Sequence, residues 1–570
     1  MSIANQLPKQ LTLAVPCPVA AEDDGYQAFM RRLKVFASTD VIAQILVLHE
    51  GPTPYLAIAD ALAEKISFIR VDSWFSGKTI ECMLEASTED IILIMTRTSS
   101  IEISERSLRE LLTTAGDRGV GFIYSDYRQI RGSEMSDQMT LNYQSGSIRE
   151  SFDFGAVVYI SKQAADAARD KYGRVEASLR WAGLYDLRLK ISTDFSLKRI
   201  PESLYVKTVA QPQVRGAAAS ADITLGGLDS RNPDHECEVE RVSTAHLLRI
   251  GAYLESTFSA IPVVREKFPV TASIVIPVRN RERTIEQAVR SALSQVASFS
   301  YNVIVVDHHS TDHTMEILRA LAIGQDQLIL KVASRPDLGI GGLWNEAVNS
   351  PECGLYALQL DSDDVYASTE TLEKMVSKFW EPALAGNGPR PSMTCPRYAM
   401  TIGSFVKVDV HLQILSSGPF KQRQWPADNG RNGALRVDSP GAPRAFYVPV
   451  LRRLGFPNVS FGEDYAIYLR IGREYEVGRI SEAVYLAREW EGNSVRSLPL
   501  GNFKSVNVKD LIPKGTLSEE DFLFLMKPIL LPLVAASKNR YHEYKDWLRT
   551  VEIDARKEIR KSGVRIHDFH

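Results

Sequence analysis

The chain has 570 residues, of which 44% are hydrophobic and 24% are charged, and its formal net charge is −3. This length suits two to four domains with sizeable cores. The near-neutral charge argues against a nucleic-acid partner, and no apolar run is long enough to span a membrane. The five cysteines are scattered without a CxxC pair, which favours a soluble protein in a reducing, cytoplasmic setting.

Both halves of the chain alternate buried-strand patterns with helical spacing. In the first half the predicted strands cover residues 11–17, 41–51, 67–71 and 89–100. In the second half they cover residues 272–278, 301–307, 328–332 and 355–360, with helices over 284–296 and 310–321. The alternation predicts an α/β protein with mostly parallel sheets, in which ligands bind at the carboxyl ends of the strands.

The matching order of these segments predicts an internal duplication. Four pairs of equivalent positions have offsets between 258 and 265: Pro16 and Pro277, His49 and Asp307, Val71 and Val332, Thr96 and Asp361. The alternative is two unrelated α/β domains whose buried strands look alike. We therefore predict domains over residues 1–210 and 271–500. A linker and bridging helix cover 211–270, and a helical extension covers 501–570.

Ordered motifs in the second half resemble the glycosyltransferase 2 family. They are SIVIPVRNRERTIEQAVRSALSQ, NVIVVDHHSTDHT, LDSDD and GED, and the resemblance covers about residues 272–493. It implies two GT-A-like domains (a Rossmann-like nucleotide-diphospho-sugar transferase fold), the second of them catalytic. It further implies sugar transfer from a UDP-, GDP- or dTDP-linked donor to a carbohydrate or small-molecule acceptor.

The strand ending in LDSDD places three carboxylates at the end of an apolar run. A plain helix cap accounts for one such acid but not for three. A hard divalent cation held by carboxylates acts as a Lewis acid on a diphosphate. By the resemblance, Asp363 binds Mn²⁺ or Mg²⁺, and Asp361 contacts the ribose or the metal. Asp364 then tunes the site or caps a following helix.

The donor pocket is expected at the ends of the neighbouring strands. The resemblance assigns Asp307 to the nucleotide base, with Pro277 and Arg279 lining the pocket and Arg335 near the nucleotide or diphosphate. The usual VDDGSTDGT reads VDHHSTDHT here, so histidines replace the second acid and both glycines. Base or phosphate contacts are favoured over a histidine metal site. The turn at 339–342 is expected to give backbone room nearby.

The GED motif implies that Asp464 is the general base that deprotonates the acceptor hydroxyl. With one such carboxylate and no obvious nucleophile, a single displacement with inversion is expected. Candidate acceptor contacts are Trp425, Asn429, Glu463 and Trp490, because flat aromatics beside amides and acids suit sugar rings. The Q/RxxRW motif of processive family members is absent, which argues against a polymer-extruding synthase.

The first half lacks these acids. Thr96, Arg97 and Thr98 stand at the expected DxD position, and Asp126 and Asp186 persist without evident partners. A non-catalytic GT-A-like domain is therefore favoured over a second active centre. The alternative of a different class is a nucleotide-sugar- or glycan-binding protein without turnover. A nucleotidyltransferase also places acids at strand ends, but it would want a Gly-rich signature near the first strand, and PVRNRERT has no glycine. The charged helix expected over 538–562 is predicted to present a solvated face while packing on the body, or else to mediate homo-oligomerisation or membrane docking.

Overall fold

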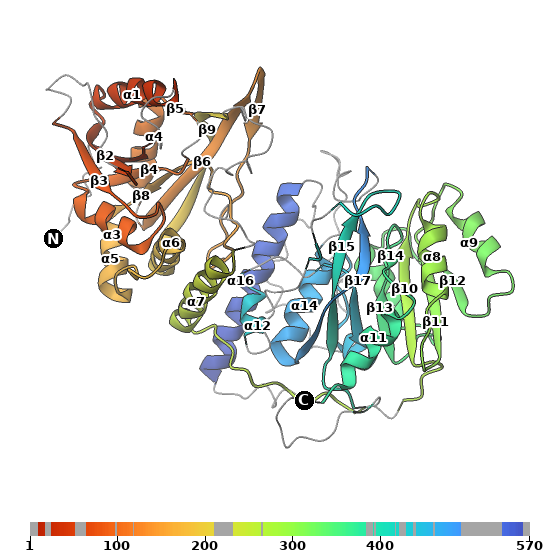
Figure 1. Cartoon of the computed structure of the whole chain (residues 1–570). Helices are drawn as coiled ribbons and strands as arrows, with labels where there is room; N and C mark the ends of the chain where they lie inside the picture. The colour runs from red at the N-terminus through yellow and green to blue at the C-terminus, as the bar shows by residue number, and fades with distance from the viewer. Residues whose placement is uncertain are drawn as a thin grey trace. The chain divides into compact units, whose positions relative to one another are not determined.

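The computed structural model divides the chain into two units, Met1–Tyr253 and Leu254–His570 (Figure 1). The boundary lies inside the stretch that the sequence assigns to a linker and bridging helix. No helix in the described part of the chain is long and apolar enough to cross a membrane. The structure describes residues 10–17, 24–51, 64–96, 100–117, 119–209, 232–263, 266–382, 392, 395–415, 418–420, 429–436, 441–459, 462–491 and 538–562.

The first unit contains a nine-stranded mixed sheet. Its strands are β1 (Leu11–Pro16), β2 (Ile42–His49), β3 (Ile66–Arg70), β4 (Asp90–Ile94), β5 (Ser100–Ile103), β6 (Val120–Arg131), β7 (Glu134–Gln138), β8 (Val157–Ile160) and β9 (Ser196–Val209). Its helices are α1 (Asp24–Ala37), α3 (Gly77–Ala86), α4 (Glu105–Ala115), α5 (Lys162–Tyr172), α6 (Gly183–Asp194) and α7 (Pro233–Ile250). Serine side chains cap α3, α4 and α5, where they accept backbone N–H groups that have no partner within the helix.

The second unit contains an eight-stranded mixed sheet. Its strands are β10 (Ala272–Val278), β11 (Tyr301–Asp307), β12 (Leu328–Val332), β13 (Tyr356–Gln359), β14 (Val365–Tyr366), β15 (Met400–Val408), β16 (Arg444–Tyr447) and β17 (Val477–Arg488). The helices are α8 (Ile285–Leu293), α9 (Thr314–Ala322), α10 (Ile340–Val348), α11 (Thr371–Ser377), α12 (Gly430–Gly433), α13 (Val448–Leu454), α14 (Glu463–Glu474) and α16 (Lys538–Ser562), with a 3₁₀ turn η1 (Lys378–Trp380).

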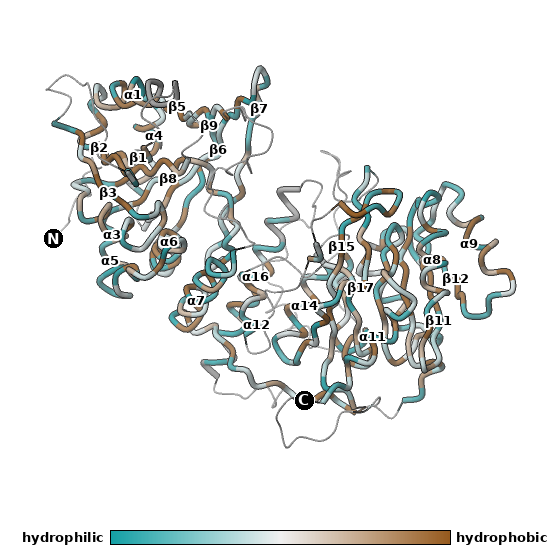
Figure 2. The backbone as a smooth tube through the Cα atoms, in the orientation of Figure 1, coloured by the Kyte–Doolittle hydropathy of each residue, from teal (hydrophilic) through white to brown (hydrophobic). Residues whose placement is uncertain are grey.

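The prediction of α/β architecture is confirmed, and both sheets are mixed, with four parallel strands in succession in each. Strands β3-β2-β1-β4 and β12-β11-β10-β13 are parallel throughout. Beyond them each sheet continues with antiparallel partners, beginning with β8 on β4 and β16 on β13. The central strands are buried along their whole length, as β1 and β11 illustrate. Figure 2 shows hydrophobic residues concentrated in the strands around β1 and β8 of the first unit.

The two sheets have the same strand order. The first runs β3-β2-β1-β4-β8-β6-β9-β5 and the second β12-β11-β10-β13-β16-β15-β17-β14, with equivalent strands in the same chain order and β7 as an addition. Each equivalent pairing also has the same direction, down to the parallel β6–β9 and β15–β17 pairs. An ancient duplication predicts this correspondence, whereas two unrelated domains would share it only by chance.

The strand registers refine the predicted equivalences. Pro16 aligns with Leu48 and Pro277 with Val306, so His49 and Asp307 are equivalent as predicted. Two other pairs shift by one residue. Arg70, not Val71, is equivalent to Val332, because the two residues pair with His49 and Asp307. Leu93 and Gln359 occupy equivalent positions in the strand registers. Two residues further on, Met95 rather than Thr96 is therefore the residue equivalent to Asp361.

Helix α7 belongs to the first unit. The carboxylate of Glu238 accepts the backbone N–H groups of Arg180, Trp181 and Ala182 just before α6, at 2.8–3.2 Å. Gly251, with φ of 74°, ends the helix in a left-handed cap that suits a residue without a Cβ.

Helix α16 packs on the second unit as predicted, but several of its charged residues, among them Glu552 and Arg556, are buried rather than solvated. Glu552 accepts from Arg473 of α14 at 2.6 Å and from Arg556 at 2.8 Å. Arg556 also donates to the backbone oxygen of Arg431 at 2.8 Å. The helical spacing in the sequence therefore predicts the helix correctly, whereas its charge pattern does not predict which face is buried.

Candidate active site

The DSDD segment follows β13 and is fixed by β17. The backbone N–H of Asp361 donates to the hydroxyl of Tyr485 at 3.0 Å. The carboxylate of Asp364 accepts the backbone N–H of Arg488 at 2.6 Å. The next element is β14, so Asp364 joins two strands and does not cap a helix.

A chain of charged and polar contacts joins Asp361 to Asp464. Gln359 Nε2 donates to Asp361 Oδ1 at 2.8 Å, and Gln359 Oε1 accepts from Arg444 Nη1 at 2.9 Å. Arg444 Nη2 then donates to Asp464 Oδ2 at 2.6 Å in a mostly buried ion pair. Four residues from β13, β16 and α14 are thus held in one network, because buried polar atoms must find partners.

Neither Gln359 nor Arg444 is among the residues singled out from the sequence. Gln359 interrupts the apolar run LYALQL, and a polar residue within a buried strand is a signal that points to it. Arg444 lies in RAFY, a four-residue strand without a motif. Its role depends on the antiparallel pairing of β16 with β13, which local sequence does not reveal.

Desolvation dominates the electrostatics of these acids. Burial raises the pKa of Asp361 to about 6, and the neighbouring charge of Asp363 adds to this effect. Burial also raises the pKa of Glu463 to about 8, assisted by the charge of Asp464. The pKa of Asp364 rises for the same reasons. Crowded, desolvated carboxylates favour protonation or a cation.

The carboxylates fit a divalent cation that also uses other ligands. Hard cations such as Mg²⁺ and Mn²⁺ take oxygen donors, and Mg²⁺ sites commonly use one or two carboxylates together with substrate phosphates. In the described residues, a group of three ligand atoms within 4.8 Å of one another occurs only at Glu150, His235 and Glu236 of the first unit. The DSDD segment is therefore not a closed cage of three protein ligands.

Two further side chains approach Asp363. Trp490 Nε1 donates to Asp363 Oδ2 at 3.2 Å, and Arg281 Nε lies 3.8 Å from the same oxygen. The guanidinium of Arg283 lies over the Trp490 ring, 5.1 Å from its centroid. Trp490, predicted as an acceptor contact, thus lies against the DxD aspartate.

Asp307 is 2% exposed and ends β11. Its Oδ2 accepts the backbone N–H of Ser310 at 3.1 Å, which holds this segment as a turn and delays the start of α9 to Thr314. Its Oδ1 is buried and has no hydrogen-bond partner among the described residues. An unsatisfied buried carboxylate oxygen is costly, so it suits an N–H donor from a ligand.

The neighbouring residues of the predicted donor pocket differ in exposure. Pro277 is half-buried in β10, and Arg279 is exposed just beyond it. Arg335 is also exposed and pairs with Asp337 at 3.1 Å. Asn280 Oδ1 accepts the backbone N–H of Thr311 at 2.8 Å, which ties the loop after β10 to the loop after β11.

The three histidines of this region do not form a metal site in the part of the chain that the structure describes. His308 Nε2 lies 3.0 Å from the Pro336 oxygen, and burial lowers the pKa of His308. His313 Nδ1 instead lies 2.9 Å from a carboxylate oxygen of Glu282. The rings of His308 and His309 are 5.9 Å apart between centroids.

The glycine turn packs against protein. A Cβ on Gly341 would lie 1.9 Å from the Pro457 oxygen, and one on Gly342 would lie 2.4 Å from Asn458 Oδ1. The expectation of backbone room beside the nucleotide is therefore wrong for these two positions. The glycines instead let α10 approach the segment that leads to Glu463.

Sequence comparison decides the family of this unit. Residues 273–426 match the sequence model of glycosyl transferase family 2. The second unit contains a family 2 glycosyltransferase domain. The match includes Asp307, Asp361 and Asp363, and it ends before Arg444 and Asp464. No curated protein matches the chain significantly.

Solved structures with detectable likeness are also glycosyltransferases. S. aureus TarS 1-349 in complex with UDP-GlcNAc is 17% identical, with 51% of this chain and 91% of that chain covered and a TM-score of 0.31. A Pyrobaculum calidifontis mannosyltransferase in complex with GDP-Man and Mn²⁺ is 17% identical, with 58% and 86% covered and a TM-score of 0.29. Mycobacterium tuberculosis glucosyl-3-phosphoglycerate synthase is 20% identical, with 39% and 73% covered and a TM-score of 0.27. Scores and identities this low define neither donor nor acceptor.

The predicted acceptor residues of the glycosyltransferase domain are dispersed. Glu463 opens α14 beside Asp464. Asn429 accepts from Asn432 Nδ2 at 2.9 Å, and Asn432 in turn binds the backbone of Leu254. Trp425 lies outside the described residues. An acceptor role for these side chains stays a prediction.

The first unit has lost the residues of this network. In the strand registers, Leu93 is equivalent to Gln359 and Val158 is equivalent to Arg444. Helices α6 and α14 end at equivalent caps, Phe195 and Tyr475. Counting back from these caps makes Leu184 equivalent to Asp464. Thr96 is buried beside Met95, and Arg97 and Thr98 lie outside the described residues.

Asp126 and Asp186 do have partners, contrary to the prediction. Asp126 Oδ2 pairs with Arg199 Nη2 at 2.6 Å, and Asp186 Oδ2 pairs with Lys190 Nζ at 2.7 Å. Both aspartates are buried, and each pair compensates a charge inside the first unit. The sequence does not reveal Arg199 as a partner because it lies 73 residues away on β9.

Proposed function

We propose that the second unit catalyses inverting, metal-dependent transfer of a sugar from a nucleotide diphosphate to an acceptor hydroxyl. The observation that carries this proposal is the Asp361–Gln359–Arg444–Asp464 network. It couples the acid at the end of the central strand to the acid at the start of α14. Such coupling positions two groups that must act on opposite ends of one reaction centre.

Asp307 is proposed to bind the nucleotide base. Its buried Oδ1 accepts a hydrogen bond, which suits uracil, thymine or guanine because each carries a ring N–H. Pro277 and Arg279 extend the same strand ends, and exposed Arg335 is available to a phosphate. The donor is therefore a UDP-, dTDP- or GDP-linked sugar.

Asp361 and Asp363 would hold Mn²⁺ or Mg²⁺. When bound, the cation supplies Lewis-acid stabilisation of the leaving diphosphate. The raised pKa of Asp361 supports this role, because a cation compensates the charge that burial disfavours. Trp490 donates a hydrogen bond to the Asp363 carboxylate and so helps to orient it.

Asp464 is proposed to accept the proton of the acceptor hydroxyl. The acceptor oxygen forms the new bond to the anomeric carbon as the bond to the donor phosphate oxygen breaks, and the proton passes to the Asp464 carboxylate. Arg444 orients this carboxylate and stabilises its ionised form. A single displacement inverts the anomeric configuration.

The test compares Asp464→Asn with Glu463→Gln in the full chain, with UDP-, GDP- and dTDP-sugars and Mn²⁺. Asp464→Asn is expected to lower kcat by about 10³-fold while donor-dependent thermal stabilisation persists. Glu463→Gln alters a predicted acceptor contact but not the proposed base, so it is expected to change the KM for the acceptor and to lower kcat far less than Asp464→Asn. No metal-dependent stabilisation by any donor, or full activity of Asp464→Asn, would refute the proposal.

We also propose that the first unit is non-catalytic. Leu93, Met95, Val158 and Leu184 stand where the second unit has Gln359, Asp361, Arg444 and Asp464. Apolar side chains at these positions cannot hold a cation or accept a proton. The first unit can still bind a sugar at another place on its surface.

A further inference from the structure

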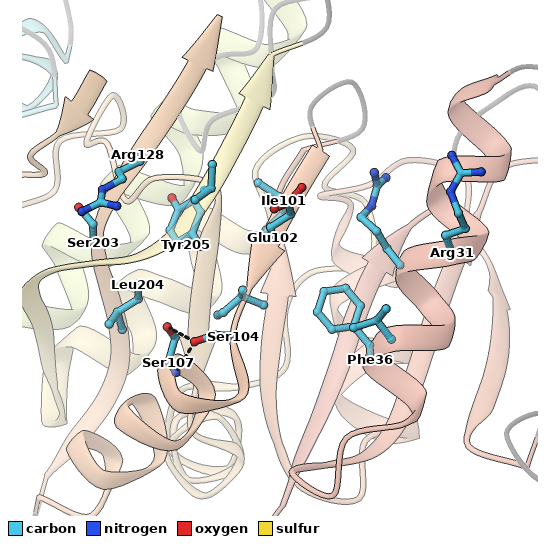
Figure 3. Close-up of a pocket in the computed structure, with 14 residues that line it drawn as sticks. Arg31, Phe36, Ile101, Glu102, Ser104, Ser107, Arg128, Ser203, Leu204 and Tyr205 are labelled. Carbon is cyan, nitrogen blue, oxygen red and sulfur yellow. Dashed lines mark hydrogen bonds between the residues drawn. The ribbon is translucent and has the colours of Figure 1, made fainter. Parts of the chain in front are cut away.

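The first unit contains an open cavity of about 640 Å³. It lies between α1, the beginning of α4, the edge strand β5 and its neighbour β9, and is called the β5 groove below (Figure 3). This volume falls within the range of small-molecule sites. Phe36, Ile101, Leu204 and Tyr205 belong to the hydrophobic core and form its apolar floor.

Arginines dominate the charge of the β5 groove. Arg31 on α1 and Arg128 on β6 stand at its two sides, with Glu102 between them, as Figure 3 shows. Arg32 also lines it, and Arg128 Nε lies 3.3 Å from Asp137 Oδ1, so three guanidinium groups are balanced by the carboxylates of only Glu102 and Asp137. This excess of positive charge favours an anionic ligand.

Two of these arginines have no carboxylate partner within ion-pair distance among the described residues. Arg32 Nη1 donates to the neutral hydroxyl of Ser100 at 2.8 Å. Burial lowers the pKa of Arg32, while the charge of Glu102 opposes this shift. Arg31 is exposed on the neighbouring position of α1. A desolvated guanidinium without a counter-ion is unfavourable, and a bound carboxylate or phosphate would compensate it.

The remaining polar groups suit hydroxyls. Ser104 caps α4, and its hydroxyl lies 2.9 Å from that of Ser107. Ser203 adds a third hydroxyl, and Glu102 can accept hydrogen bonds. Glu102 would repel a bare anion but can bind the hydroxyls of a sugar. An apolar floor, hydroxyl-binding groups and arginines together match a sugar that carries acidic groups.

In the equivalent region of the second unit, hydrogen bonds join the neighbouring elements to one another. There α8, β14 and α11 take the places of α1, β5 and α4 in the chain. The backbone N–H of Tyr366 on β14 donates to Ser291 on α8 at 3.4 Å. The side chain of Gln295 binds both the Ser368 oxygen and the Leu372 N–H. The arginines of the open β5 groove belong to the first unit, whereas polar contacts between neighbouring elements occupy the equivalent positions in the second unit.

We propose that the β5 groove is a binding site for an acidic carbohydrate, with its carboxylate or phosphate groups on Arg31, Arg32 and Arg128. The sugar rings lie on the apolar floor, and their hydroxyls bind Glu102 and the serines. This acidic carbohydrate would also be the acceptor chain of the transfer reaction. That role rests on the proposed function, whereas binding to the groove does not. The first unit thereby contributes recognition without catalysis.

The experiment titrates the full chain, without donor, with fluorescent tetragalacturonate, pentamannose 6-phosphate and neutral maltotetraose. One or both acidic oligosaccharides are expected to bind, and the stronger ligand distinguishes a carboxylate site from a phosphate site. Arg31→Glu/Arg128→Glu is expected to weaken that binding by about tenfold or more, because two favourable ion pairs become repulsive. Arg180→Glu, an exposed change away from the groove, should bind like the unmodified chain.

Three results would overturn the inference. They are no binding of either acidic oligosaccharide, equal binding by the Arg31→Glu/Arg128→Glu variant, and equally strong competition by inorganic phosphate. Thermal unfolding verifies that the variants fold, and Arg31→Gln/Arg128→Gln repeats the test without charge reversal. Stabilisation by UDP-sugar and Mn²⁺ is measured in parallel. If it persists while oligosaccharide binding is absent, the inference fails and the proposed function stands; the reverse pattern refutes only the proposed function.

Discussion

At the residue scale, Arg444 joins the two acidic ends of the candidate site. It is 7% exposed and donates to both Gln359 and Asp464. A charge in this position stabilises the fold only while its partner is present, because an unpaired buried ion is strongly unfavourable. The same contact sets the orientation of the proposed general base. Stability and catalysis therefore depend on one side chain.

We predict that Arg444→Met lowers the free energy of unfolding by about 3–5 kcal/mol, because Asp464 loses a mostly buried partner. It should also lower kcat by about 10²-fold with a smaller change in KM, since the base is misplaced rather than removed. Urea unfolding and steady-state kinetics measure the two effects. Arg453→Met on α13 breaks a more exposed pair with Glu474 and should cost about 0–1 kcal/mol. An unchanged kcat in Arg444→Met would contradict a positioning role.

Glu463 gives a prediction about pH. Its pKa is raised to about 8 in the folded protein, above the value of about 4.3 in an unfolded chain. The neutral form is therefore favoured by folding, and its contribution is complete at low pH and lost as the pH rises to about 8. Glu463→Gln does not titrate. Its stability relative to the unmodified chain should increase by about 1–3 kcal/mol between pH 5 and pH 8, because the carboxyl keeps partial contact with solvent. A constant difference in urea unfolding across this range would contradict the raised pKa.

At the element scale, α16 is held by buried charges as well as by apolar packing. Burial works against the charge of Glu552, yet Arg473 and Arg556 hold its pKa below the usual range. All three residues are largely buried, and Arg473 comes from α14, the helix that begins with Glu463 and Asp464. Helix α16 thus supports the element that carries the proposed base.

Glu552→Ala is expected to lower the free energy of unfolding by about 3–5 kcal/mol, because it leaves two buried guanidinium groups without their carboxylate. Asp554→Ala on the exposed face of the same helix should cost about 0–1 kcal/mol, since its pair with Lys557 is exposed to solvent. Chemical denaturation of both variants measures the difference. Equal effects would show that the charge network does not stabilise α16.

At the scale of the whole molecule, two copies of one topology differ in the residues at their strand ends. The second copy keeps carboxylates at its strand ends, while the first replaces them with apolar residues and opens the β5 groove. A duplicated fold permits this division, because the sheet is stabilised by its buried strands and not by the residues at their ends.

Hydrogen exchange of the full chain should show that the two units respond differently to the donor. With Mn²⁺ and the donor that binds, protection should increase after β10, β11 and β13, where Asp307 and Asp361 lie. The equivalent ends of β1, β2 and β4 should show no change, because no group there binds a nucleotide diphosphate. Protection at both sets of strand ends would instead favour a protein with two active centres. Tetragalacturonate or pentamannose 6-phosphate in place of the donor should protect the segments that line the β5 groove, in α1, β5, α4 and β9, and not the strand ends.

The sequence by itself determined the parallel strands of each half, several of the helices, the repeat and the acids at the strand ends. These features are local: buried strands are written as apolar runs, and DSDD and GED are contiguous. Tertiary structure alone decided the mixed sheets, the one-residue shifts in the repeat, and the network through Gln359 and Arg444. It also decided that Asp126 is paired with Arg199 and that the charges of α16 are buried. Each of these depends on strands or helices distant in sequence, and the pairing of such elements is set by packing over the whole sheet rather than by any short segment.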